Sequence, residues 1–199
     1  MVVPSLPGAE RVDLVVIGGS AGAVEVITQI APHLSKRLAP PVAVVIHMAR
    51  DARALLPDIL SAPGRPPMKF AEDKEPIAPG TVYFAAPGYH LLIEAERTFA
   101  LSVDEPEHFS RPSIDVLFES AADAYGPRVA GVILSGANTD GAAGLRAIAD
   151  AGGITIVQRP NASEVPTMPE AALHACPNSH LIDAPALAKW LASLERSNP

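Results

Sequence analysis

Short apolar runs alternate with segments of helical periodicity along most of this chain. Four runs are rich in β-branched residues and carry apolar side chains at odd and even positions alike: 12–17, 42–46, 129–134 and 154–157. Strands without a polar face are buried on both sides, as they are in a parallel sheet. The helical segments between them supply the crossovers that parallel neighbours need. We therefore expect an α/β fold: a three-layer, doubly wound, mostly parallel sheet with helices on both faces.

Residues 81–103 break this alternation and indicate an added β-hairpin, with arms at 90–94 and 98–103, near an edge of the sheet. The other expected elements are helices at 23–34, 53–60, 110–124, 141–150, 168–175 and 184–195, and short strands at 68–70, 81–85 and 181–182. Together they predict a single domain over residues 1–199, with its core at about 12–195.

Composition excludes several classes of function. The chain has 15 basic and 22 acidic residues, a formal net charge of −7, which disfavours binding to a nucleic-acid backbone or an anionic membrane. No apolar run approaches the roughly 20 residues of a membrane-spanning helix, and residues 1–13 lack the pattern of a signal peptide. The single Cys176 allows neither an internal disulfide nor a Cys-rich zinc site. We expect a cytoplasmic protein.

Three strand ends carry reactive side chains. Ser20 follows the run at 12–17 within a G-x-S-x-G pentapeptide, His47 directly follows the run at 42–46, and Asp140 ends the loop after 129–134. The carboxyl ends of parallel strands lie at one edge of the sheet, where ligands bind. A hydroxyl, an imidazole and a carboxylate together are the set that nucleophilic acyl transfer requires.

Each of these residues also has a purely structural interpretation. Ser20 could cap the helix that follows it, His47 could be a buried histidine bonded to backbone, and Thr139 or Asp140 could cap the helix at 141–150. The glycines at 18–22 do not match a dinucleotide-binding fingerprint in either register, and the chain has no P-loop. The convergence of three strand ends favours the catalytic interpretation.

Eight ordered blocks resemble the catalytic domain of CheB-type protein-glutamate methylesterases of bacterial chemotaxis, over residues 14–183. They are GGSAG at 18–22, IHM at 46–48, AED at 71–73, PGTVYFAAP at 79–87, RPSIDVLF at 111–118, GVILSG at 131–136, DGAAGL at 140–145 and MPEAA at 168–172. The resemblance implies hydrolysis of glutamyl methyl esters on the cytoplasmic helices of chemoreceptors, with release of methanol, and in some members deamidation of glutamine.

The resemblance also implies roles for individual residues. Ser20, His47 and Asp140 align with the family's nucleophile, histidine and aspartate. The backbone N–H groups of Ala21 and Ala137 become the expected oxyanion donors. Possible substrate contacts are Arg111 and Met168. We expect neither a metal nor an organic cofactor.

Two departures from the family pattern leave alternatives open. The loop before Asp140 reads GANTD at 136–140, where the family usually has a Met and a Gly at 137 and 138. Only about 13 residues precede the first strand, so we expect no N-terminal receiver domain, and a separate regulatory protein could take its place. A catalytically weak binding module in chemosensory signalling is the main alternative, and a small-molecule hydrolase is another.

Overall fold

Seven parallel strands form the central sheet of the computed structural model, which describes residue 6, residues 11–48 and residues 55–195. Every neighbouring pair in the sheet is parallel. Their order across the sheet is β3 (Met68–Phe70), β4 (Val82–Phe84), β2 (Val42–Ile46), β1 (Leu14–Gly19), β7 (Val129–Ile133), β8 (Ile154–Gln158) and β9 (His180–Ile182). The α/β, doubly wound prediction is confirmed.

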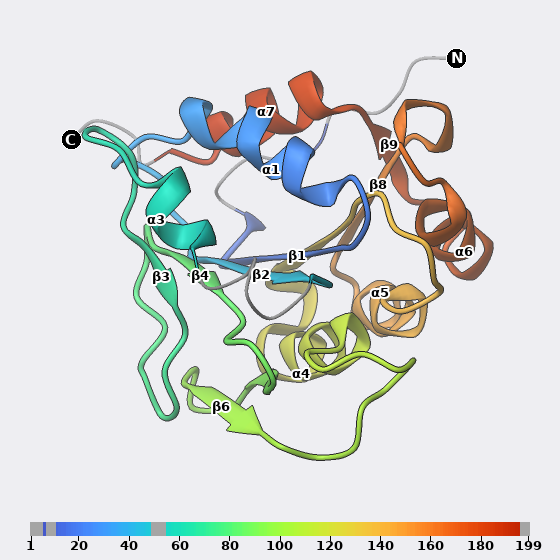
Figure 1. Ribbon diagram of the computed structural model, residues 1–199, viewed down its shortest axis with the longest axis horizontal. Helices are drawn as coiled ribbons and strands as arrows, with labels where there is room; N and C mark the ends of the chain where they lie inside the picture. The colour runs from blue at the N-terminus through green and yellow to red at the C-terminus, as the bar shows by residue number, and fades with distance from the viewer. Residues whose placement is uncertain (1–5, 7–10, 49–54, 196–199) are drawn as a thin grey trace.

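Helices cover both faces of this sheet (Figure 1). On one face lie α1 (Ala23–Ile30), α3 (Leu56–Leu60) and α7 (Ala184–Ser193), and on the other lie α4 (Ile114–Tyr125), α5 (Ala142–Asp150) and α6 (Thr167–Ala175). Successive side chains of a strand point to opposite faces. Val15 and Ile17 of β1 accordingly join the first core, and Leu14 and Val16 join the second.

Element ends differ from the sequence prediction where local chemistry intervenes. Helix α1 ends at Ile30 and continues as a 3-10 turn, Ala31–His33, because Pro32 has no N–H for a further helical bond. Helix α4 begins only after Ser113, whose hydroxyl caps it by accepting a hydrogen bond from the Val116 N–H at 3.5 Å. The start of the helix expected at 53–60 lies partly outside the described residues.

The predicted hairpin is present as β5 (His90–Ile93) and β6 (Phe99–Ser102). It forms its own two-stranded antiparallel sheet and packs against α4 instead of extending the parallel sheet. The buried ring of Phe99 meets Tyr83 of β4 edge-on, with ring centroids 4.8 Å apart. This packing sets the hairpin and the loop that follows it beside the start of α4.

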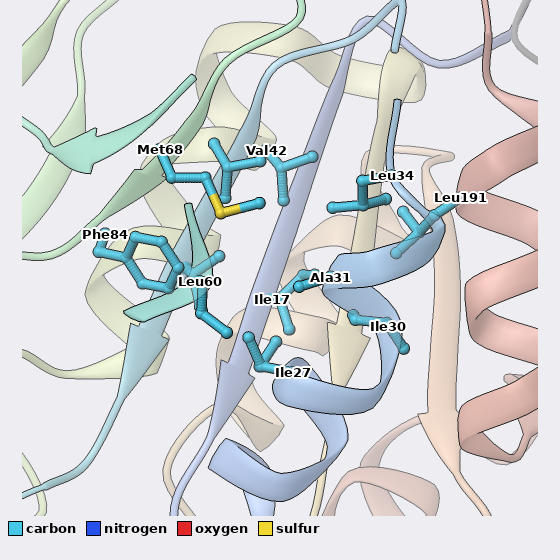
Figure 2. Close-up of a pocket in the computed structure, with 12 residues that line it drawn as sticks. Ile17, Ile27, Ile30, Ala31, Leu34, Val42, Leu60, Met68, Phe84 and Leu191 are labelled. Atoms are coloured by element: carbon cyan, nitrogen blue, oxygen red, sulfur yellow. The ribbon is translucent and has the colours of Figure 1, made fainter. Parts of the chain in front are cut away.

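A small cavity between the sheet and α1 belongs to the first core. Figure 2 shows apolar side chains from the strands, α1 and the neighbouring helices converging on it. With about 20 Å³ of free space and no polar group in its lining, it offers a bound water no hydrogen-bond partner. Over the described residues, the helices are too short or too polar to span a lipid bilayer.

Candidate active site

The ends of β1, β2 and β7 meet at one edge of the sheet. The ladder continues past the last paired residues: His47 N donates to Gly19 O at 2.9 Å, and Ser20 N donates to Ser135 O at 2.8 Å. Beyond this edge β1 leads into α1 on one face, whereas β7 leads into α5 on the other. The two connections diverge at the carboxyl ends of the strands, which is where open α/β sheets bind ligands, and Ser20 lies at this edge.

Tight packing around the glycines shapes the turn that carries Ser20. A Cβ atom on Gly18 would lie 2.3 Å from Ile114 Cγ2, so this strand can approach the start of α4 only without a side chain. Gly22 has a φ of +80° and is itself the N-cap of α1, which receives no side-chain cap bond. The interpretation of Ser20 as that helix's cap is therefore wrong, and its hydroxyl is partly exposed.

Asp140 lies directly against His47. The distance from His47 Nε2 to Asp140 Oδ2 is 2.8 Å, with 9% of the imidazole side chain and none of the carboxylate exposed. The geometry between this nitrogen and the carboxylate oxygen is not that of a regular hydrogen bond, so the contact is a close polar approach. Within the described part of the chain, the ring makes no hydrogen bond to backbone, contrary to the structural interpretation of this histidine.

The Asp140 carboxylate is held by the start of α4. It accepts hydrogen bonds from Ser113 Oγ at 2.9 Å, from Ile114 N at 2.7 Å and from Asp115 N at 3.0 Å. Burial alone would raise the pKa of Asp140, but His47 and these N–H donors outweigh it and hold that pKa below its usual value. Asp140 is thus a charged anchor at the positive end of a helix.

The expectation that Thr139 or Asp140 caps the helix at 141–150 is wrong. Helix α5, which follows Asp140 in the chain, has Gly141 as its N-cap and receives no side-chain cap bond. Thr139 supplies only its backbone carbonyl, to Ala142 N at 3.2 Å. The carboxylate turns instead towards the start of α4, where Ile114 lies 26 residues earlier in the chain.

A second buried carboxylate lies beside the first. Asp115 accepts a hydrogen bond from Gly144 N at 2.6 Å, and His108 Nε2 lies 3.3 Å from its other oxygen. Burial raises the pKa of Asp115 to about 6, with a further contribution from Asp140 and an opposing one from the Gly144 N–H.

His108, Asp115 and Asp140 form the one group of potential metal ligands among the described residues. Ligand atoms of His108, Asp115 and Asp140 lie within 4.8 Å of one another. Asp140 already accepts three hydrogen bonds and contacts His47, so a cation there would compete with those donors.

Ser110 is a site residue that sequence analysis missed. Its hydroxyl oxygen lies 3.4 Å from His47 Nδ1, the ring nitrogen that faces away from Asp140. In the described structure no hydrogen bond joins the Ser20 hydroxyl to His47. Ser110 follows no strand, so the strand-end argument could not find it. The only signal was its position next to the block at 111–118.

The loop after β7 presents free backbone donors. The N–H groups of Ala21 and Ala137 donate to no protein group in the part of the chain described, and both residues are exposed. Gly136 N donates to Val165 O at 3.0 Å, and Met168 N donates to Gly136 O at 2.9 Å. These two bonds hold the loop just before Ala137.

Met168 and Arg111 support loops of the site. The Met168 side chain is only 1% exposed, and a Cβ on Gly136 would lie 2.6 Å from its methyl group. It packs beneath the loop and presents no surface to a substrate in this structure. The guanidinium of Arg111 donates to Val103 O at 2.8 Å and Asp104 O at 2.9 Å, which fixes the loop between the hairpin and α4.

Comparison with known proteins agrees with this fold. The family model for the CheB methylesterase matches residues 15–191. A relative from Leptospira interrogans is 40% identical over 94% of this chain and 96% of its own length. Protein-glutamate methylesterase/protein-glutamine glutaminase 1 of Carboxydothermus hydrogenoformans is 36% identical over 90% of this chain, which spans only 54% of that relative.

A solved structure has the same fold. The CheB methylesterase catalytic domain of Thermotoga maritima superposes with a TM-score of 0.86 at 29% identity, covering 92% of this chain and 98% of that domain. The fold and these relatives together define a hydrolase built on a doubly wound α/β sheet. The chain belongs to the CheB methylesterase family.

Proposed function

We propose that this protein hydrolyses glutamyl methyl esters on the cytoplasmic helices of chemoreceptors and releases methanol. The observation that carries the proposal is the buried contact of His47 with Asp140 at the sheet edge where Ser20 lies. Relatives named protein-glutamate methylesterase support the choice of substrate. The site would act in the cytoplasm, where those receptor helices lie.

The geometry assigns the two ring nitrogens of His47 different tasks. Nε2 lies against Asp140, so Nδ1 is the nitrogen left to accept the proton of the Ser20 hydroxyl. Ser20 Oγ then attacks the ester carbonyl, and the charged imidazole is stabilised by Asp140. Return of that proton to the departing methoxide releases methanol and leaves an acyl-enzyme, which water hydrolyses by the same route.

The Ser110 hydroxyl must move away from His47 Nδ1 during this series of reaction steps. Its 3.4 Å approach to Nδ1 is long for a hydrogen bond that involves a hydroxyl, so a Ser20 hydroxyl brought up by substrate can replace it. Catalytic hydrogen bonds are often long in a free enzyme and shorten when substrate binds.

The N–H groups of Ala21 and Ala137 are suited to stabilising the tetrahedral oxyanion. Neither is used within the described protein, and helix α1 adds positive potential beyond Ala21. Donors of this kind are typically worth about 3 kcal/mol each in the transition state. The same steps on a glutamine side chain would release ammonia, which is the deamidase activity in the relatives' names.

The test is methanol release from a receptor fragment carrying methyl-labelled glutamyl esters, with EDTA present. We expect labelled methanol from the wild type and no loss of rate from the chelator, because protein groups alone perform each step. A rate abolished by EDTA and restored by one metal would refute this chemistry. Receptor binding without methanol release would instead favour the binding-module alternative.

A further inference from the structure

The turn at residues 107–110 has an unusual backbone for its sequence. Glu107 and Ser110 pair as an antiparallel bridge, with N–H···O distances of 3.2 and 2.7 Å. The two residues between them, His108 and Phe109, have φ values of +48° and +60°. Two-residue hairpin turns of this kind favour asparagine and glycine, and a bulky aromatic residue with positive φ is a true outlier.

Three consecutive side chains of this turn point to three different places. His108 reaches inward to the buried carboxylate of Asp115 at 3.3 Å, and Ser110 reaches His47 at 3.4 Å. Phe109, between them, is fully exposed, at 104% of its reference area. The turn is therefore anchored on both sides and holds one aromatic ring in solvent beside the candidate catalytic histidine.

Strain of this kind persists where a displayed side chain is used. We propose that Phe109 is a docking residue that packs against apolar side chains of the receptor helix that presents the methyl ester. The inference rests on the proposed function, since that function supplies the helix. Phe109 adjoins Ser110, which contacts His47, so a long segment that brings an ester to this histidine can also contact the exposed Phe109 ring.

The surrounding charge explains why the contact would be apolar. A hollow of about 330 Å³ lies next to the turn, between the hairpin and α4. Five carboxylates line it: Asp104, Glu105, Glu107, Glu119 and Asp123. This surface repels an acidic segment, so a substrate helix rich in carboxylates gains no Coulomb attraction there. Exposed apolar area that binding would bury provides an attraction independent of charge.

Binding to a purified, methyl-esterified receptor fragment tests the proposal, with every variant made in the Ser20→Ala background so that no ester is consumed. We expect Phe109→Ala to weaken binding roughly tenfold, the loss of one buried apolar anchor. The matched control is Ile59→Ala, which removes a side chain of 68% exposure on α3, over the edge strand β3, and should leave binding unchanged.

A second variant separates docking from folding. Phe109→Gly suits the positive φ, so it should weaken receptor binding as much as Phe109→Ala without lowering the melting temperature. With Ser20 intact, both Phe109 variants should hydrolyse p-nitrophenyl acetate at the wild-type rate, because this small ester does not reach the turn.

These measurements distinguish the docking role of Phe109 from the proposed methylesterase function. Unchanged receptor affinity in both Phe109 variants, or an equal loss in Ile59→Ala, would overturn the docking role. A wild type that releases no methanol would refute the proposed function, and weaker binding of the Phe109 variants would still support docking.

Discussion

Asp140 combines two tasks that are usually given to different residues. It satisfies the N–H groups at the start of α4, and Oδ2, which accepts the Ile114 N–H, also contacts His47. Both depend on the negative charge, because hydrogen bonds to a charged acceptor are the stronger kind.

Replacement of Asp140 by asparagine should therefore lower activity and stability together. Asn keeps one acceptor oxygen but loses the charge that stabilises the His47 cation, so we expect a loss of about a thousandfold or more in kcat. Weaker bonds to α4 should cost about 1–3 kcal/mol of unfolding free energy. Rate and urea-unfolding measurements on the same variant check both, and a fully active Asp140→Asn protein would exclude the assigned role.

Asp115 should make stability fall as pH rises through the mildly acidic range. Its pKa is raised from 3.8 to about 6, so the folded state binds a proton that the unfolded chain has already lost. Stability therefore declines between about pH 4 and pH 6, by about 3 kcal/mol at 1.4 kcal/mol per pKa unit. Asp140, with a lowered pKa, loses its contribution only below the usual value of 3.8, outside this window.

The control for this pH dependence of stability is Asp115→Asn, whose side-chain oxygen can still accept the hydrogen bond from the Gly144 N–H. Its unfolding free energy should decline less between pH 4 and pH 6 than that of the wild type, and the remaining decline belongs to other groups such as Glu119, whose pKa is raised by burial. Identical pH profiles for the two proteins would contradict the assignment of the raised pKa to Asp115.

Among single residues, those at strand ends could be predicted and those defined by tertiary contacts could not. Ser20 and His47 follow from the rule that parallel strands end at a common edge. Ser110 reaches His47 from a loop 63 positions away, and Asp140 bonds α4 instead of the helix that follows it. No local pattern encodes such pairings, because they depend on how separate elements pack.

At the scale of elements, the contact of β1 with the start of α4 positions both the Ser20 turn and the Asp140 anchor. Gly18→Ala should disturb it, since the new Cβ would lie 2.3 Å from the buried Ile114 side chain. Overpacking of this kind costs about 1–3 kcal/mol. Displacement of α4 should also lower activity through Asp140.

A double-variant cycle with Ile114→Ala tests whether the clash with Ile114 causes the loss of stability in Gly18→Ala. If the clash is responsible, Gly18→Ala with Ile114→Ala should cost less unfolding free energy than the sum of the two single changes. Strict additivity would show that the strand-to-helix contact is not the source of the loss.

The helices and strands that could be predicted are those whose position follows from the apolar pattern of a single segment. The buried strands and main helices follow from apolar periodicity, although β1 runs two residues further than the apolar pattern, to Gly19, because backbone pairing continues through glycine. The hairpin was recognisable, but its packing on α4 was not, because Leu91 and Phe99 carry no sign of which face they cover.

At the scale of the whole molecule, the strand order places Ser20, after β1, next to His47, after β2, and the loop before α4 brings the Ser110 hydroxyl to the His47 ring. Ser110 is the one in contact in the free protein. Ser20 has the strand-to-helix turn, the neighbouring free N–H of Ala21 and the end of α1 around it. These surroundings favour Ser20 as the nucleophile.

Methanol release from the methyl-labelled receptor fragment, compared between Ser20→Ala and Ser110→Ala, tests that assignment most directly. We expect Ser20→Ala to lower the rate by about a thousandfold or more, the usual cost of removing a nucleophile of this kind, and Ser110→Ala to stay within a few-fold of wild type. A Ser110→Ala protein that releases no methanol, beside a Ser20→Ala protein that remains active, would contradict the account.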